Sequence, residues 1–230
     1  MSQPRISQGN SWERYKQELF LLIHETLLVL QLQTNLPEIE DNAKYHSLNR
    51  ELFRCFRVSY RKLNLSFHMP TREGKNPPYF GDIAPTEREE KRPDFYWQFI
   101  DSLASEDSCE RRFILECKRL GSPSSSNWKL NPNYVNHGVL RFLSSPHEYG
   151  KGDDAGGMIG YVQDMEFDDI LQEVNQTAAT HPKPIPLLQI VKNWEEKETS
   201  ELVHDLQRPF PISPFRLHRF WVDLREYPGD

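Results

Sequence analysis

The chain has 230 residues and carries 34 acidic against 28 basic side chains, a formal net charge of −6 at pH 7 with histidine neutral. This length allows one well-buried core, and the acidic balance argues against a strong general affinity for the nucleic-acid backbone. An acidic protein can still act on nucleic acid if its basic side chains line one groove, or if a partner protein supplies the contacts with the backbone. Three cysteines without CxxC spacing indicate neither a disulfide framework nor a zinc site.

The beginning of the chain lacks the apolar core of a signal peptide. The longest apolar run, residues 19–30, is interrupted by His24, Glu25 and Thr26 and is too short to span a bilayer. We therefore expect a cytoplasmic protein with no membrane partner.

Two helices are predicted near the N-terminus. Ser11 can cap the first, and its apolar residues recur at helical spacing until the break at residues 35–37. The second runs from Asp41 to Lys62 with an apolar stripe on one side. Its other face carries five basic residues: Arg50, Arg54, Arg57, Arg61 and Lys62. Such a face is ordinarily solvated, and the wall of a nucleic-acid groove is the alternative.

The remainder of the chain alternates between apolar segments and loops. Strands are predicted over 63–69, 94–101, 111–120, 157–162, 187–193 and 217–224, and helices over 134–143 and 167–178. A charged, proline-broken insertion is expected between the last two strands. A mixed sheet with helices on its faces buries these elements, so we predict an α/β fold.

We expect two parts that form one compact unit. Residues 1–40 are predicted as a tail and helical extension, and residues 41–230 as one α/β domain. The glycine-rich stretch 150–160 lacks the spacing of a phosphate-binding loop, so we predict a loop that leads into a buried strand.

The residues best suited to chemistry lie between Arg92 and Leu120. Asp94 follows a proline at the start of one predicted strand, and Glu116-Cys117-Lys118 ends the next. Side chains alternate along a strand, so Glu116 and Lys118 project to one face and Cys117 to the other. Two carboxylates and one ammonium gathered at the ends of neighbouring strands can hold a divalent cation and act on a water beside it. The stretch therefore predicts phosphodiester hydrolysis.

The strings RPDFYWQFI and RFILECKRL resemble the PD-(D/E)XK nuclease superfamily, and the likeness covers roughly residues 41–164. The resemblance implies a restriction-endonuclease-like fold whose core runs helix, three strands, helix, strand. It implies a metal-dependent endonuclease in which Asp94, Glu116 and the Cys117 carbonyl bind Mg²⁺ or Mn²⁺, while Lys118 serves the attacking water. It also implies DNA before RNA as substrate, a homodimer or another protein partner, and a role in restriction or antiviral defence.

Two accessory residues are predicted, one from the same resemblance and one from its place in the expected sheet. Members of the superfamily carry a further acid on the helix before the first strand. Glu51 fits that place best and Glu25 competes with it, although both also suit ordinary boundary positions. Gln163 follows a strand expected beside the active strands, which suggests a substrate-facing role, although a polar strand end is the commoner explanation.

The sequence leaves a second function open. The same fold can serve as a catalytically silent or partner-activated subunit that acts as a binding or scaffold module. The acidic balance favours this alternative, and the intact set of Asp94, Glu116 and Lys118 disfavours it.

Overall fold

The computed structural model describes residues 9–32, 41–65, 67–79, 82–101, 105, 109–190, 200–209 and 212–225. Its helices are α1 (Gly9–Gln31), α2 (Asp41–Leu63), α3 (Leu130–Asn136) and α4 (Phe167–Thr180), with 3-10 turns η1 (Glu87–Glu90) and η3 (Val139–Phe142). Its strands are β1 (Thr71–Arg72), β2 (Phe95–Ile100), β3 (Glu110–Leu120), β4 (Ala155–Val162), β5 (Gln189–Ile190), β6 (Ser200–Leu206) and β7 (Phe215–Asp223).

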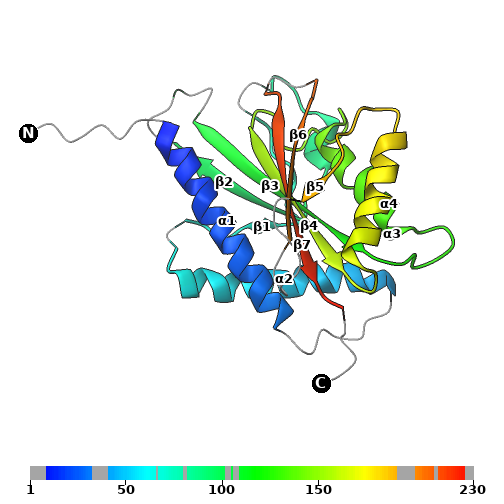
Figure 1. Cartoon of the computed structure of the whole chain (residues 1–230). Coiled ribbons are helices and arrows are strands. Elements are labelled where there is room, and N and C mark those ends of the chain that lie inside the picture. Colours follow the sequence, from blue (N-terminus) through cyan, green and yellow to red (C-terminus); the bar gives the residue numbers. More distant parts are fainter. Residues whose placement is uncertain are drawn as a thin grey trace, which may run out of the picture.

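The strands form one mixed sheet in the order β1-β2-β3-β4-β7-β6-β5. The β2–β3 pair is antiparallel, β4 runs parallel to both β3 and β7, and β6 returns antiparallel to β7. Helices α1 and α2 cover one face of the sheet, and α3 and α4 cover the other (Figure 1). The predicted α/β class with a mixed, helix-flanked sheet is confirmed.

The alternation of side chains along β3 divides the core into two halves. Phe113, Leu115 and Cys117 pack with α1 and α2, whereas Ile114 and Leu120 pack with α3 and α4. Even-numbered positions near the end of β3 therefore face the α3 side. Glu116 and Lys118, which are predicted to be catalytic, therefore lie on the α3 side of the sheet.

Helix α1 belongs to the same core as α2. Leu19, Leu22 and Leu27 are fully buried within the cluster that contains the α2 stripe. The described part of the predicted extension is thus packed against the sheet. No helix in the described part of the chain is long and apolar enough to cross a membrane.

The strand predicted over 63–69 is wrong for the residues that the structure describes there. Helix α2 continues to Leu63, and Asn64 then takes a left-handed φ of 51° while the Leu65 N–H bonds the Tyr60 carbonyl at 3.4 Å. This is a helix-ending arrangement. Leu65 and Phe67 still pack against the core, so their alternation reflects burial of an irregular segment.

Strand β6 lies where a charged insertion was predicted. Its residues alternate: Leu202 and Leu206 are fully buried, whereas Glu201 and Asp205 occupy the other face and make the segment polar. Pairing with β7 satisfies its backbone groups. The neighbouring predicted strand 187–193 is reduced to β5 within the described residues, since 191–199 lie outside them.

The helix predicted over 134–143 begins earlier and divides in two. Helix α3 starts at Leu130 and η3 follows it after Gly138. A Cβ on Gly138 would collide with the Tyr134 carbonyl oxygen and with the Met158 side chain. Only glycine allows the chain to approach the sheet this closely.

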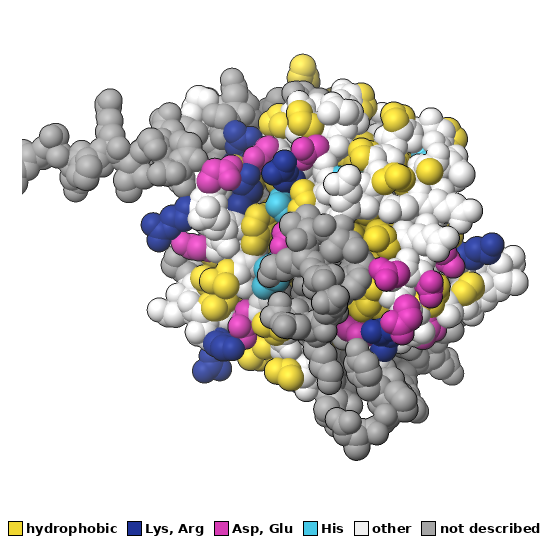
Figure 2. Space-filling model, in the orientation of Figure 1, with side chains coloured by type: hydrophobic (Ala, Val, Ile, Leu, Met, Phe, Trp, Pro, Cys, Tyr) yellow, Lys and Arg dark blue, Asp and Glu magenta, His cyan; other side chains and the backbone are white. Residues whose placement is uncertain are grey.

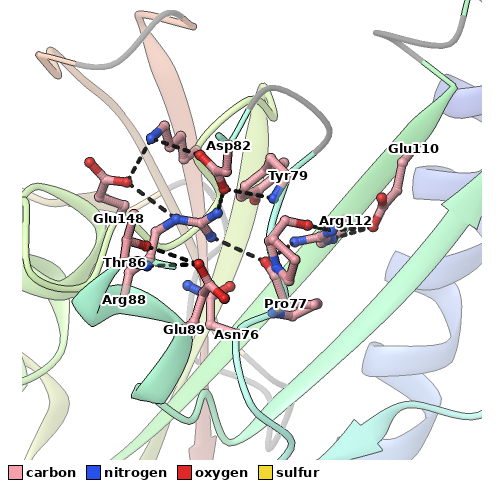
Figure 3. A network of polar contacts seen from close by, with 12 residues as sticks. Asn76, Pro77, Tyr79, Asp82, Thr86, Arg88, Glu89, Glu110, Arg112 and Glu148 are labelled. Atoms are coloured by element: carbon pink, nitrogen blue, oxygen red, sulfur yellow. Dashed lines mark hydrogen bonds and ion pairs between the residues drawn. The ribbon is translucent and has the colours of Figure 1, made fainter. Parts of the chain in front are cut away.

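A buried polar network holds the long loop between β1 and β2 (Figure 3). Arg88 of η1 makes an ion pair with Asp82, and Arg88 and Arg112 both donate to the Pro77 carbonyl, at 3.2 and 2.6 Å. The two guanidinium groups also lie 4.8 and 4.2 Å from the ring centre of Tyr79. Buried charges are stable only with such partners, so the network fixes the loop that leads to β2.

Glu201 of β6 connects three elements of the fold. Its carboxylate lies 3.6 Å from His24 Nε2 on α1 and 3.9 Å from His218 Nδ1 on β7. Hydrogen bonding from His218, and then from His24, lowers the pKa of Glu201 from 4.5 to about 2.

Glu201→Gln is expected to lower the free energy of unfolding by about 1 kcal/mol near pH 6, a modest value because the two ion pairs are partly exposed. A carboxylate with a lowered pKa stabilises the fold above its unfolded pKa of 4.5, and this contribution fades as the pH falls from 4.5 toward 2. Urea unfolding from pH 6 to pH 3 measures the difference. A deficit that does not shrink over this range contradicts the assignment.

Candidate active site

Asp94 lies directly before β2 and is held from two sides. Phe95 is in register with Leu115, so Asp94 lies where the β2–β3 pair ends. Its Oδ1 accepts a hydrogen bond from Asn49 Nδ2 at 2.9 Å, and its Oδ2 accepts one from the Cys117 backbone N–H at 2.7 Å. Because each oxygen receives a donor, the orientation of this carboxylate is fixed.

Glu116 is fully buried on β3 and has two cationic partners. Its Oε1 contacts Lys118 Nζ and accepts from Arg141 Nη1 at 2.5 Å. Among the described residues, its Oε2 has no hydrogen-bond partner. A buried carboxylate is costly unless it is paired and hydrogen-bonded. The second oxygen is therefore a buried acceptor suited to a further donor or a cation.

Lys118 connects the two acceptors at the end of β3. Its Nζ contacts Glu116 and donates to the Cys117 carbonyl at 2.9 Å. The three residues predicted as catalytic, Asp94, Glu116 and Lys118, thus lie in one cluster with the Cys117 backbone.

The Cys117 side chain points to the opposite face, as the alternation predicts, and is fully buried in the α1/α2 half of the core. Burial, followed by the charge of Asp94, raises the pKa of its thiol well above the ordinary range. A neutral buried thiol is inert. Only the backbone of Cys117 belongs to the site.

Asn49, not Glu51, is the α2 residue that reaches the cluster. Asn49 is fully buried, donates to Asp94 and accepts from Tyr161 Oη at 2.9 Å. Glu51 instead makes an ion pair with Arg54 at 3.1 Å. Asn49 lies at helical spacing from the buried residues of α2, and this pattern predicts its burial. The resemblance implies an acid on this helix, so it does not point to an amide.

The other accessory candidates lie apart from the cluster. Glu25 pairs with Lys62 at 2.5 Å and joins α1 to α2. Gln163 comes directly after β4, and its N–H donates to the Leu120 carbonyl at 3.1 Å. Since Lys118 is in register with Gly160, Gln163 lies three residues, roughly 10 Å, farther along the strands.

A pocket of about 860 Å³ opens onto the cluster. Four basic residues (Arg92, Lys118, Arg119 and Arg141) and two acidic ones (Glu73 and Asp94) line it. On the face of the protein seen in Figure 2, by contrast, Lys and Arg side chains are interspersed with Asp and Glu. An acidic chain thus gathers positive charge in this hollow.

Arg141 of η3 is the basic residue of the site that sequence reasoning missed. It comes from a segment 25 residues beyond Glu116, and nothing in its local pattern distinguishes it from a surface arginine. Two histidines lie close enough to Arg141 for its charge to affect their pKa. Burial lowers the pKa of His137 and His147, and the positive charge of Arg141 lowers it further. Both shifts favour the neutral form of the imidazole.

The donor set fits a magnesium-type cation. No group of three or more His, Cys, Asp and Glu side chains suited to a metal occurs among the described residues. Mg²⁺ needs only one or two carboxylates, because it keeps several waters. Asp94, Glu116 with its unsatisfied Oε2, and the Cys117 carbonyl supply oxygen donors of the required hardness.

No family model, curated protein or solved structure matches the chain.

Asn49→Ala is expected to lower the free energy of unfolding by about 2 kcal/mol, because it removes the donor to Asp94 Oδ1 and the acceptor of the buried Tyr161 hydroxyl. Urea denaturation measures the change. Asn127→Ala removes an exposed amide from the rim of the same pocket and should cost less than about 0.5 kcal/mol. Equal stability of the two variants would exclude a structural role of Asn49 at the site.

Proposed function

We propose that the protein is a metal-dependent nuclease that hydrolyses phosphodiester bonds. One observation carries the proposal: Asp94, Glu116 and Lys118 form one cluster that opens into a pocket with a basic lining. Phosphate is an anion, and a pocket in which four basic residues outnumber two acidic ones attracts it. Asp94 lines the same pocket, so a divalent cation held there would lie between this carboxylate and the phosphate to be cut.

The arrangement of elements supports a restriction-endonuclease-like fold. The elements α2, β1, β2, β3, α3 and β4 follow the order helix, three strands, helix, strand that the resemblance implies. The first three strands pair antiparallel, and β4 joins β3 in parallel. Asp94 lies directly before β2 and Glu116 lies on β3, which agrees with the positions that the resemblance implies.

The residues of the site have separable roles in this proposal. Asp94, Glu116 and the Cys117 carbonyl would hold Mg²⁺ or Mn²⁺, which lowers the pKa of water and offsets the charge of the phosphate. Lys118 Nζ donates hydrogen bonds, so it orients the attacking water and stabilises the negative charge that develops on the phosphate. Arg141 supplies a second cation at the same place.

The resemblance extends the proposal beyond the chemistry. It favours DNA over RNA, a homodimer or another protein partner, and a role in restriction or defence against foreign DNA in the cytoplasm. The chain has a net charge of −6 and gathers basic residues in its pocket. A partner would supply further contacts with the phosphates of the nucleic-acid backbone outside this pocket.

The wild-type protein is expected to nick supercoiled plasmid with Mg²⁺ or Mn²⁺ and not in EDTA. Asp94→Asn and Lys118→Ala should each lower the rate by roughly 100-fold or more, because each removes a group that contacts the reacting atoms. Gel assays of plasmid conversion measure the rates. Lys183→Ala, at an exposed lysine after α4, is the matched control and should cleave at the wild-type rate. A fully active Lys118→Ala variant would overturn the role of this lysine.

A non-catalytic binding module of the same fold is the second candidate. The specific observation in its favour is that Lys118 and Arg141 already neutralise Glu116 without a metal. The acids of the cluster would then serve the fold alone.

Binding of Mn²⁺ separates the two functions. A nuclease site should bind Mn²⁺ saturably in a calorimetric titration, and Glu116→Gln should weaken the affinity by roughly tenfold or more, since a first-row cation site depends on its carboxylates. Glu173→Gln, on α4, is the control acid. Absence of both Mn²⁺ binding and cleavage would favour the binding module.

A further inference from the structure

The pocket has an aromatic wall in addition to its basic lining. Trp128 and His137 both line it, and their rings are nearly parallel, with centres 6.0 Å apart and planes 2° apart. Trp128 is 52% exposed, whereas the other tryptophans in the described part of the chain, Trp12, Trp97 and Trp221, are at most 9% exposed. An indole left half in solvent beside a pocket can contact a ligand that enters the pocket.

The backbone holds Trp128 in a defined position. Its N–H donates to the Ser125 carbonyl and its carbonyl accepts from the Ser124 N–H, both at 3.1 Å. These bonds form an isolated bridge between Ser125 and Trp128 in the loop from β3 to α3. An aromatic ring presented by a fixed turn loses little entropy when a ligand packs on it.

Basic and aromatic groups together are suited to a nucleotide. Arg92, Lys118 and Arg141 line the pocket and can contact phosphate oxygens, and Trp128 offers a flat apolar surface to a base. The His137 ring lies parallel to the indole. Burial, followed by the charge of Arg141, lowers the pKa of His137, which favours the uncharged ring. Positively charged grooves with stacking aromatics are how single strands are bound.

The state of the base follows from geometry. Inside a duplex both faces of a base are covered by its neighbours, so an indole can stack only on a base that is unpaired or extruded. A pocket of about 860 Å³ has the size of a small-molecule site. A single nucleotide fits a site of this size.

We propose that Trp128 stacks on an unpaired base of a nucleic-acid strand whose phosphates lie along Arg92, Lys118 and Arg141, so that the preferred substrate is single-stranded next to the scissile bond. This inference deepens the proposed function and rests on it, because the same pocket would receive the strand to be cut.

The test is binding of a fluorescein-labelled 20-nucleotide single strand without self-complementarity, and of its duplex, in EDTA at low salt, followed by fluorescence anisotropy. Trp128→Ala should weaken single-strand binding by about 5- to 150-fold, the equivalent of about 1–3 kcal/mol for one stacked base. Trp128→Phe should stay within about threefold of wild type because it retains an aromatic face. Duplex binding should be unaffected by either change.

Leu187→Ala is the matched control, since Leu187 is also 52% exposed and lies outside the pocket lining. Thermal unfolding of Trp128→Ala should equal that of wild type, as expected for an exposed side chain. Failure of the wild-type protein to bind the single strand, or equal binding by wild type and Trp128→Ala, overturns the inference.

The assay also separates this inference from the proposed function. Trp128-dependent binding in EDTA, together with no metal-dependent cleavage, would keep the stacking site and reject the nuclease. Metal-dependent cleavage that Trp128→Ala leaves unchanged on single-stranded and duplex DNA would keep the nuclease and reject the stacking site.

Discussion

A carboxylate buried near the end of β3 is the constraint on which the site depends. Glu116 is fully buried, and an unpaired charge there would cost several kcal/mol. Lys118 comes from the same strand two residues later, so alternation alone puts it on the same face. Arg141 reaches Glu116 from η3. This position of η3 depends on Gly138, where the chain approaches Met158 of β4 closely. The packing of the α3 side thus serves the neutralisation of one acid.

The two acids of the cluster are held by different means. Asp94 receives neutral donors, an amide and a backbone N–H, which fix its direction. Glu116 contacts two cations through one oxygen, and its other oxygen is left without a hydrogen bond among the described residues. Asp94 lines the basic pocket, and Glu116 has one oxygen without a hydrogen bond among the described residues, which is the physical basis for proposing a cation and a phosphate at this place.

Two errors in prediction have one cause. The segment 63–69 alternates because an irregular chain buries every second side chain, and β6 escaped notice because charged residues occupy its outward positions. In both, hydrophobicity reports burial and not hydrogen-bond pairing. Asn49 was passed over for a related reason, since composition suggests which residues carry charge but not which neutral amide will lie between Asp94 and Tyr161.

The sequence by itself determined the α/β class, the helices α1, α2 and α4, the β2–β3 hairpin, and the shared face of Glu116 and Lys118. These follow from the periods of 3.6 and 2 residues, which are local rules. Only the tertiary structure decided which distant residues join the site. Asn49 contacts Asp94 from 45 residues earlier in the chain, and Arg141 contacts Glu116 from 25 residues later. Trp128 lines the same pocket. Contacts between distant segments depend on how whole elements pack, and no local pattern encodes them.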